Sequence, residues 1–283
     1  MFAHRLTTYL LVLAALGCQT ESETISPSEV SSFDTQQTSV MAENVRLKQM
    51  IVTGENGGLG PMFTTAYFTY SQGHELSKVV IPSSTMAGSW TYLYTYDEQD
   101  RIKSYRMLRE HPTNNGNMGQ QVNYSYNNGE ILETSVQVQT DGQLIPYSIE
   151  PNLRTFYHFN DQGQVTELFQ EGVVRFGAET SQRVLYTYEN GNIVKVTMIN
   201  GENQVESVIT YEYDDKVNPF YKGTHMPYSE LNSSRNNIVS AQVNDNEPQR
   251  KEYTYNEQGL PLTQKYVSTG AVLTYEYESF KNQ

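Results

Sequence analysis

The feature that most constrains the fold is a short motif that returns along the chain. Two aromatic residues flank a single residue, a turn rich in Asp, Asn and Gly follows, and an aliphatic residue comes next. Because side chains alternate along a strand, the two rings share one face. A repeat of roughly 30 residues built this way predicts successive antiparallel β-hairpins. Clear copies begin at Tyr94, Tyr124, Tyr157, Tyr186 and Tyr253, and looser ones lie near Tyr67, Tyr211 and Tyr275.

The turns within these copies are of two kinds. Asn128-Gly129 and Asn190-Gly191 are typical of two-residue type I′ hairpins, which need positive φ at both positions. The longer turns run from Asp or Asn to a Gly three residues later, which predicts a type I turn closed by a left-handed residue. Asp100 replaces that Gly in one copy, and Asp tolerates the left-handed conformation.

Both kinds of turn place the aliphatic residue opposite the second aromatic residue. Each such aromatic–aliphatic pair stabilises a hairpin by roughly 0.2–1 kcal/mol. The copy beginning at Tyr253 has Leu260 and Pro261 after its Gly, and proline cannot donate to a sheet. We therefore expect an edge position or a shifted register there. The expected pairs elsewhere are Tyr96 with Ile102, Tyr126 with Ile131, Phe159 with Val165, and Tyr188 with Ile193.

The composition agrees with an all-β fold. The chain has 22 tyrosines but only 10 phenylalanines and one tryptophan, and tyrosine favours half-exposed strands. After residue 42 no segment has the pattern of a capped amphipathic helix. A series of hairpins must close, coil or stack to hide its edges. We expect one β domain over residues 43–283, formed by a single large curved antiparallel sheet or an incomplete barrel.

The N-terminus has the pattern of a secretory signal peptide over residues 1–17. Arg5 precedes an apolar run that ends at Gly17, and the run is shorter than the roughly 20 residues that span a bilayer. The segment Ala15-Leu16-Gly17-Cys18 resembles the lipobox of bacterial lipoproteins, with Ala15 where Leu is usual. This resemblance implies lipidation of Cys18, with a diacylglyceryl group on sulfur and an acyl group on the new N-terminus.

An unmodified, buried Cys18 is the alternative to lipidation. We favour lipidation because Cys18 is the only cysteine, and a single free thiol in a secreted chain would need another explanation. Several acyl chains would hold the protein firmly to a membrane. The predicted location is the bacterial envelope, at the outer membrane and outside the cytoplasm.

Residues 18–42 are predicted to be the lipidated cysteine and a disordered tether. Ser, Thr, Glu and Gln dominate from Gln19 to Ser39, so this stretch lacks the apolar area needed to fold. As a flexible coil it would span roughly 25–30 Å. Glu21 and Glu23 resemble the acidic export tags of some surface lipoproteins, although a solvated spacer explains them equally well.

The net charge of the chain limits the kinds of molecule that it is expected to bind. Removal of Arg5 with the signal leaves 18 basic and 32 acidic residues, a formal net charge of −14. That balance disfavours nucleic acid and anionic lipid surfaces. We expect the membrane to be reached through Cys18, with a glycan or a protein as the remaining class of ligand.

No motif for catalysis, cofactor binding or metal binding is present. Asp214-Asp215 lacks the alternating acidic pattern of a calcium loop, so we expect a turn after a strand there. A Gly-x-Ser-x-Gly nucleophile motif is also missing. A pair of glycosidase carboxylates stays open, because its separation in space defines it. Spacing typical of metal ligands is missing from the histidines, which are His4, His74, His111, His158 and His225.

Two features have both a structural and a functional interpretation. The tyrosines could stack on a ligand, but their hairpin spacing favours cross-strand packing. The interval over residues 216–250 interrupts the repeat with Pro219, Phe220 and His225. Such a segment is either a functional loop or a packing element, and we favour packing.

Two families resemble this sequence. The repeat unit looks like the YD repeat of RHS-type proteins, although no RHS core signature is present. It also resembles a family of bacterial lipoproteins of unknown function with a porin-like fold. The segments that carry the second resemblance run from Tyr211 to Phe220, from Ser234 to Ile238 and from Leu273 to Tyr277. The resemblance implies a lipid-anchored β-protein and brings no known activity or catalytic residue.

A porin-like fold does not require a membrane-spanning barrel. Spanning strands need roughly 9–11 residues with one apolar face, whereas these strands carry Tyr, Thr, Ser, Gln and Glu. A lipid anchor would also be redundant on a spanning barrel. We predict a non-enzymatic binding or structural module, with a secreted hydrolase acting on glycan or peptide as the alternative.

Overall fold

The computed structural model describes residues 45–55, 61–71, 75–82, 89–110, 118–127, 130–138, 152–173, 179–221 and 230–280. The predicted signal peptide, Cys18 and the tether lie outside these residues. The described residues form sixteen strands and one short helix, α2 (Glu230–Ser233). The strands are β1 (Val45–Glu55), β2 (Pro61–Tyr70), β3 (Leu76–Ile81), β4 (Ser89–Tyr96), β5 (Ile102–Glu110), β6 (Met118–Asn127), β7 (Glu130–Val138), β8 (Asn152–Phe159), β9 (Val165–Val173), β10 (Glu179–Glu189), β11 (Asn192–Asn200), β12 (Val205–Val217), β13 (Asn236–Val243), β14 (Gln249–Tyr255), β15 (Pro261–Tyr266) and β16 (Val272–Ser279).

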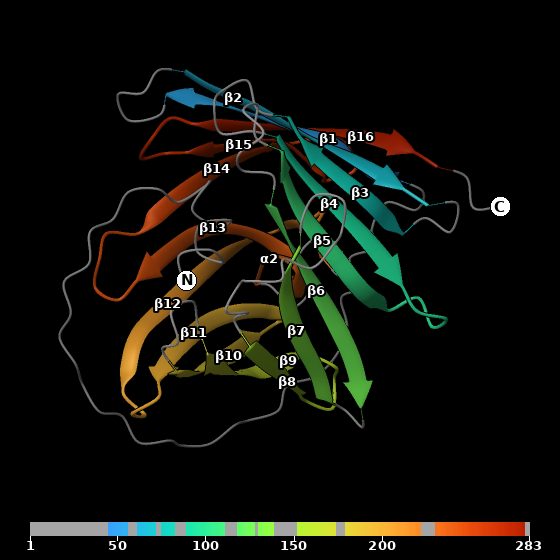
Figure 1. The fold of residues 1–283 in the computed structure, drawn as a ribbon. Coiled ribbons are helices and arrows are strands. Elements are labelled where there is room, and N and C mark those ends of the chain that lie inside the picture. The colour runs from blue at the N-terminus through green and yellow to red at the C-terminus, as the bar shows by residue number, and fades with distance from the viewer. Residues whose placement is uncertain are drawn as a thin grey trace.

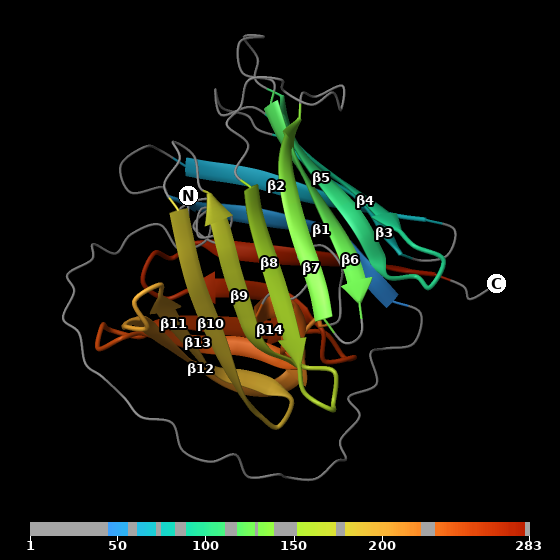
Figure 2. The same cartoon turned by 60° about the horizontal axis from the view of Figure 1, so that its bottom comes forward.

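The strands form a closed antiparallel barrel in which each strand pairs with its neighbours in sequence (Figure 1). Figure 2 shows the same ring of strands with β7–β10 in front of β13 and β14. The prediction of an all-β antiparallel fold is confirmed, but the expectation of an open sheet or incomplete barrel is wrong. The first and last strands pair from Val45↔Ser279 to Thr53↔Val272. This pairing satisfies the backbone groups that two free edges would expose.

The predicted turn conformations are confirmed wherever the structure describes them. Asn190 and Gly191 have φ values of 52° and 80°, as a type I′ turn requires. In the longer turns Asp100, Gly163 and Gly259 have φ values of 58°, 73° and 75°. The turn predicted at residues 128–129 lies outside the described residues.

All four predicted aromatic–aliphatic pairs are present as cross-strand partners. The expectation for Pro261 is wrong. Pro261 faces Tyr255 just as the aliphatic residues face their tyrosines, and β15 lies between β14 and β16 rather than at an edge. Proline is tolerated because Pro261 is the first residue of its strand.

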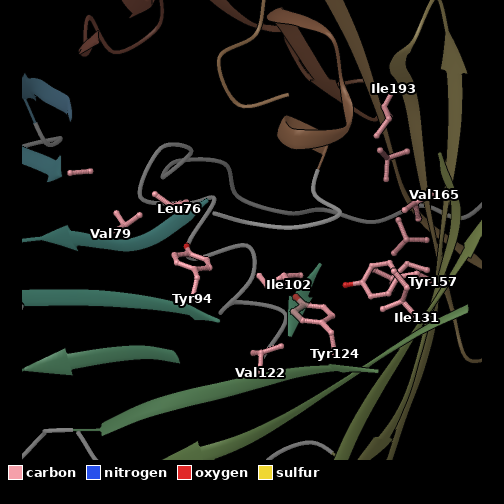
Figure 3. Close-up of a cluster of buried hydrophobic side chains, with 14 residues drawn as sticks. Leu76, Val79, Tyr94, Ile102, Val122, Tyr124, Ile131, Tyr157, Val165 and Ile193 are labelled. Carbon is pink, nitrogen blue, oxygen red and sulfur yellow. The ribbon is translucent and has the colours of Figure 1, made fainter. Parts of the chain in front are cut away.

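The two faces of the barrel wall differ in character. The inner face carries a continuous core that includes Tyr94, Tyr124 and Tyr157, all less than 9% exposed. Figure 3 shows these tyrosines pointing into the space that the strands enclose, together with aliphatic side chains such as Ile102 and Val165. The repeated tyrosines therefore pack the interior, which confirms the structural interpretation of their spacing.

The second tyrosine of several copies also makes a specific hydrogen bond. Its hydroxyl donates to a backbone carbonyl within the first three residues of the preceding strand. In these copies the bond ties one hairpin to the strand before it, and phenylalanine could not make it. The bonds run from Tyr70 to Leu47 (2.7 Å), Tyr96 to Leu76 (2.7 Å), Tyr126 to Ile102 (2.6 Å), Tyr213 to Ile193 (2.6 Å) and Tyr277 to Pro261 (2.8 Å).

We predict that Tyr126→Phe lowers the free energy of unfolding by about 1 kcal/mol, because the Ile102 carbonyl loses its donor while the ring packing is kept. The control is Tyr67→Phe, since Tyr67 is 46% exposed. It should change stability by less than about 0.5 kcal/mol. Urea unfolding measures both values, and equal effects would show that the hydroxyl bond is not stabilising.

Candidate functional site

The connection between β12 and β13 folds against the barrel interior, at the end of the barrel where the turns of the repeat lie. Phe220 is 8% exposed and packs with Leu47, Tyr266, Leu273 and Tyr275. Its ring meets Tyr275 edge-on at 6.2 Å. Figure 1 shows α2, from the same connection, in the middle of the ring of strands. The described part of the interval over residues 216–250 therefore packs the core, as favoured from its sequence.

Asn218 fixes the path of this connection. It is 1% exposed, its amide nitrogen donates to the Ser234 carbonyl at 2.8 Å, and its side-chain oxygen accepts from the Phe220 backbone at 2.9 Å. Ser234 is fully buried, and its hydroxyl accepts from the Ile193 backbone N–H at 3.2 Å. These bonds satisfy polar groups that would otherwise be costly to bury.

Asp214 is the acidic centre of the same region. Its carboxylate accepts from the Asn237 backbone at 3.1 Å, from the Lys216 backbone at 3.0 Å and from the Tyr255 hydroxyl. Burial and this carboxylate both raise the pKa of Tyr255. The hydroxyl therefore stays protonated and donates, so Asp214 links β12 to β13 and β14.

The expectation that Asp214 and Asp215 form a turn after a strand is wrong. Both lie within β12, where pairing with β13 jumps from Tyr213↔Ile238 to Val217↔Asn236. The irregular stretch turns Asp214 toward Asn237 and leaves Asp215 exposed beside Lys216 at 3.0 Å. Local residue types could not reveal this, because the donors to Asp214 come from distant segments.

A second group of side chains lies on the inner face of β14–β16. Lys251, Tyr253 and Tyr255 alternate with exposed residues along β14, so all three face inward. Lys251 pairs with Tyr266 across the sheet, and its ammonium lies 5.4 Å from the centre of that ring. Gln264 accepts from the Tyr275 hydroxyl at 2.9 Å and lies 3.0 Å from the Tyr253 hydroxyl.

Burial shapes the electrostatics of this group. Desolvation lowers the pKa of Lys251 to about 8, and no nearby acid opposes it. Burial also raises the pKa of Tyr266 to about 12 and that of Tyr275 well above its ordinary value. The tyrosines stay neutral, and Lys251 is the titratable group of this inner face near neutral pH.

Elsewhere on the inner face, the described residues include one deeply buried acid. Glu133 on β7 is 4% exposed and accepts from the Tyr157 hydroxyl at 2.8 Å. Its neighbours across the sheet continue a polar row, with Thr155 on β8 and Gln170 on β9 joined at 3.1 Å.

The described residues contain no cluster of three or more His, Cys, Asp and Glu side chains suited to a metal ion. His158 lies on β8, and its imidazole faces away from the core because the adjacent Tyr157 points inward. The other histidines considered in the sequence lie outside the described residues.

The outer face carries charged side chains in cross-strand pairs. Arg183 on β10 contacts Glu167 on β9 at 2.6 Å, and Arg154 on β8 contacts Glu171 on β9. On the far side of the barrel, Lys265 and Glu252 are exposed on β15 and β14, 4.0 Å apart. Within the part of the chain that the structure describes, no helix has the length and apolar character needed to cross a bilayer.

Comparisons with known proteins show a likeness of fold. No family model and no curated protein matches the sequence. A crystal structure of a porin-like protein from Bacteroides uniformis matches with a TM-score of 0.52 and 11% identity, covering 82% of this chain and 98% of that chain. A porin-like protein from Bacteroides vulgatus aligns with a TM-score of 0.41 and 12% identity, covering 83% of this chain and all of that one. At 11% identity, the Bacteroides uniformis match shows a shared porin-like fold.

We predict that Asn218→Ala lowers the free energy of unfolding by about 2–4 kcal/mol, because two buried groups lose their partners and a cavity remains. Asn256→Ala is the matched control. Asn256 accepts similar backbone bonds in a partly exposed repeat turn. Its loss should cost about 1 kcal/mol. Denaturant unfolding of both variants gives the comparison, and an equal loss would contradict a special role for Asn218.

We predict that Lys251→Met stabilises the protein at pH 7, by up to roughly 3 kcal/mol. In the folded state Lys251 loses its proton near pH 8, whereas the unfolded chain keeps it to about pH 10.5. The unfolded state thus binds more protons between these values, so wild-type stability rises as the pH increases from 7 to 9.5. Unfolding across this range should show that rise in the wild type and in the exposed control Lys265→Met, but not in Lys251→Met.

Proposed function

We propose that this protein is a lipid-anchored, non-enzymatic envelope protein whose barrel stands outside the bilayer and binds a ligand on its inner face. The observation that carries the proposal is the distribution of side chains across the barrel wall. Tyrosines and aliphatic residues pack inside, while charged pairs such as Arg183 and Glu167 lie outside. A membrane-spanning barrel has the opposite arrangement, with an apolar outer band.

A Lys or Arg on the lipid face of a barrel costs roughly 2–4 kcal/mol at the bilayer midplane. Arg183 lies near the middle of β10, and Glu167 is the third residue of β9. The strands β3, β14 and β15 contain only 6, 7 and 6 residues, short of the roughly 9–11 that a spanning strand needs. Contact with water suits this outer face better than contact with lipid.

The anchor and the location rest on the sequence. The lipobox-like segment ending at Cys18, the signal pattern before it and the polar stretch behind it support lipidation and a tether. The structural neighbours from Bacteroides are described as porin-like proteins, which supports an envelope location. The resemblance to lipoproteins of unknown function agrees with this proposal, and the resemblance to YD repeats concerns only the hairpin unit.

A binding role fits the inner face better than a purely structural one. Most tyrosines there are used in packing and in bonds to backbone carbonyls. The β14–β16 region differs, because it combines aromatic rings with the half-buried residue Lys251, whose ammonium group has no acidic partner among the described residues. Burying an unpaired charge lowers the stability of the fold, so its presence here favours a role in binding.

We predict that Cys18→Ala releases the protein from the membrane fraction when it is expressed in a bacterial host that lipidates its own lipoproteins. Without the acyl chains, the charged outer face gives the barrel no hold on lipid. Cell fractionation and labelling with a fatty-acid analogue measure the result.

Gly17→Ala is the control, since alanine also suits the position before the cysteine and labelling should persist. If the Cys18→Ala chain still incorporates the analogue, Cys18 is not the lipidated residue. If it loses the label and its signal segment but stays in the membrane fraction, the barrel itself spans the bilayer.

A further inference from the structure

We infer that Lys251 is the anion-binding residue of a site inside the barrel for an organic monoanion with an apolar body. This inference deepens the proposed function, because it names the residue and the class of ligand for the inner face. It does not depend on the lipid anchor.

The repeat itself singles out Lys251. The residue two places before each aromatic pair shares the inner face with that pair. In the copy that contains Tyr253 and Tyr255 this position holds Lys251, whereas the seven other copies have uncharged residues there. Those residues are Ala66, Tyr92, Val122, Thr155, Val184, Ile209 and Leu273. A cation therefore replaces the usual core residue at one place in the barrel.

The row of residues that continues from Lys251 across the inner face ends in small side chains. Across the sheet the neighbour of Lys251 is Tyr266, and Tyr266 faces Ala271, whose carbonyl accepts from the Tyr266 N–H at 2.8 Å. Gly54 comes next in the row, because a Cβ on Gly54 would lie 2.8 Å from that of Ala271. The row thus begins with the cation Lys251, continues with the ring of Tyr266 and ends with the two small residues Ala271 and Gly54.

The accessibility of the row supports a ligand site. Lys251, Tyr253 and Ala271 face inward, yet each keeps part of its surface accessible, whereas Tyr266 and Leu273 are buried. Lys251 as a residue is half-buried on this inner face, and burial lowers the pKa of its ammonium group to about 8.

No carboxylate among the described residues compensates the charge of Lys251. Burial is the only cause of its lowered pKa, and no described carboxylate lies within ion-pair distance. Its partner within the described residues is the face of the Tyr266 ring, which offers a weak attraction compared with a carboxylate. A ligand with one anionic group would supply the missing counter-charge.

The surrounding residues define the rest of the ligand. Tyr266, Leu273 and Tyr275 form an apolar cluster, with Val52 and Ala271 packed against it. Tyr266, Leu273 and Tyr275 are already covered, by Phe220 among others, so the apolar surface left for a ligand is that of the half-buried Val52 and Ala271. This surface favours an aromatic or alkyl body through burial of apolar area. A single cation favours a single carboxylate or sulfonate, so the class is an amphiphilic monoanion and not a polyphosphate.

The test compares two dyes that share one apolar body. The first, 8-anilinonaphthalene-1-sulfonate, carries a sulfonate, and the second, N-phenyl-1-naphthylamine, is neutral. Both are titrated by fluorescence against the mature chain bearing Cys18→Ala, with and without Lys251→Met. We expect the sulfonate dye to bind at least tenfold more weakly to the Lys251→Met variant, while the affinity for the neutral dye stays within about twofold.

Lys265→Met is the matched control, because Lys265 lies on the neighbouring strand, faces outward and is near Glu252. It should leave the affinity for both dyes unchanged. The inference is overturned if Lys251→Met binds the sulfonate dye as tightly as its parent chain, or if Lys265→Met weakens it equally. Because the chains carry no lipid, failure here is distinct from failure of the anchor proposal, which fractionation decides.

Discussion

Five copies of the repeat share one contact that joins the barrel wall, the hydrogen bond from a tyrosine hydroxyl to a backbone carbonyl near the start of the preceding strand. Tyr96 and Tyr126 each make it to a residue beside the previous turn. The same tyrosines face the aliphatic residues of their own hairpins. One side chain therefore sets the register within its hairpin and joins that hairpin to the one before. Antiparallel hairpins added in this way coil into a continuous wall, and the wall closes when β16 meets β1.

Closure changes the meaning of the alternating pattern. In an open sheet both faces could meet solvent, but in a barrel the face that carries the tyrosines becomes an interior. Sixteen strands enclose more space than the repeat-derived side chains fill on their own, since diameter grows with strand number. The β12–β13 connection supplies part of the remainder, with Phe220 against Tyr275 and Asn218 bound to Ser234. The segment that interrupts the repeat thus adds to the core that the repeated hairpins form.

The local structure could be predicted from sequence because its determinants are local. The turn residues Asn190, Asp100 and Gly163 and the four aromatic–aliphatic pairs follow from spacing and backbone conformation alone. Barrel closure could not be predicted, because it joins segments more than 200 residues apart in the chain. The role of Asp214 was hidden for the same reason, since its donors Asn237 and Tyr255 are brought to it by folding. Pro261 was misjudged because an edge strand was assumed where the barrel has none.

Lys251 is a different case, because its signal was present in the sequence. It lies two residues before an aromatic pair, at a position where the other copies of the repeat have no charge. A residue that breaks a local rule without compensation, and that lowers stability by doing so, marks a place where selection acts on something other than folding. The structure describes no counter-charge that would reduce this cost. The simplest physical account is that the compensation comes from outside the chain, as the anion of a bound ligand.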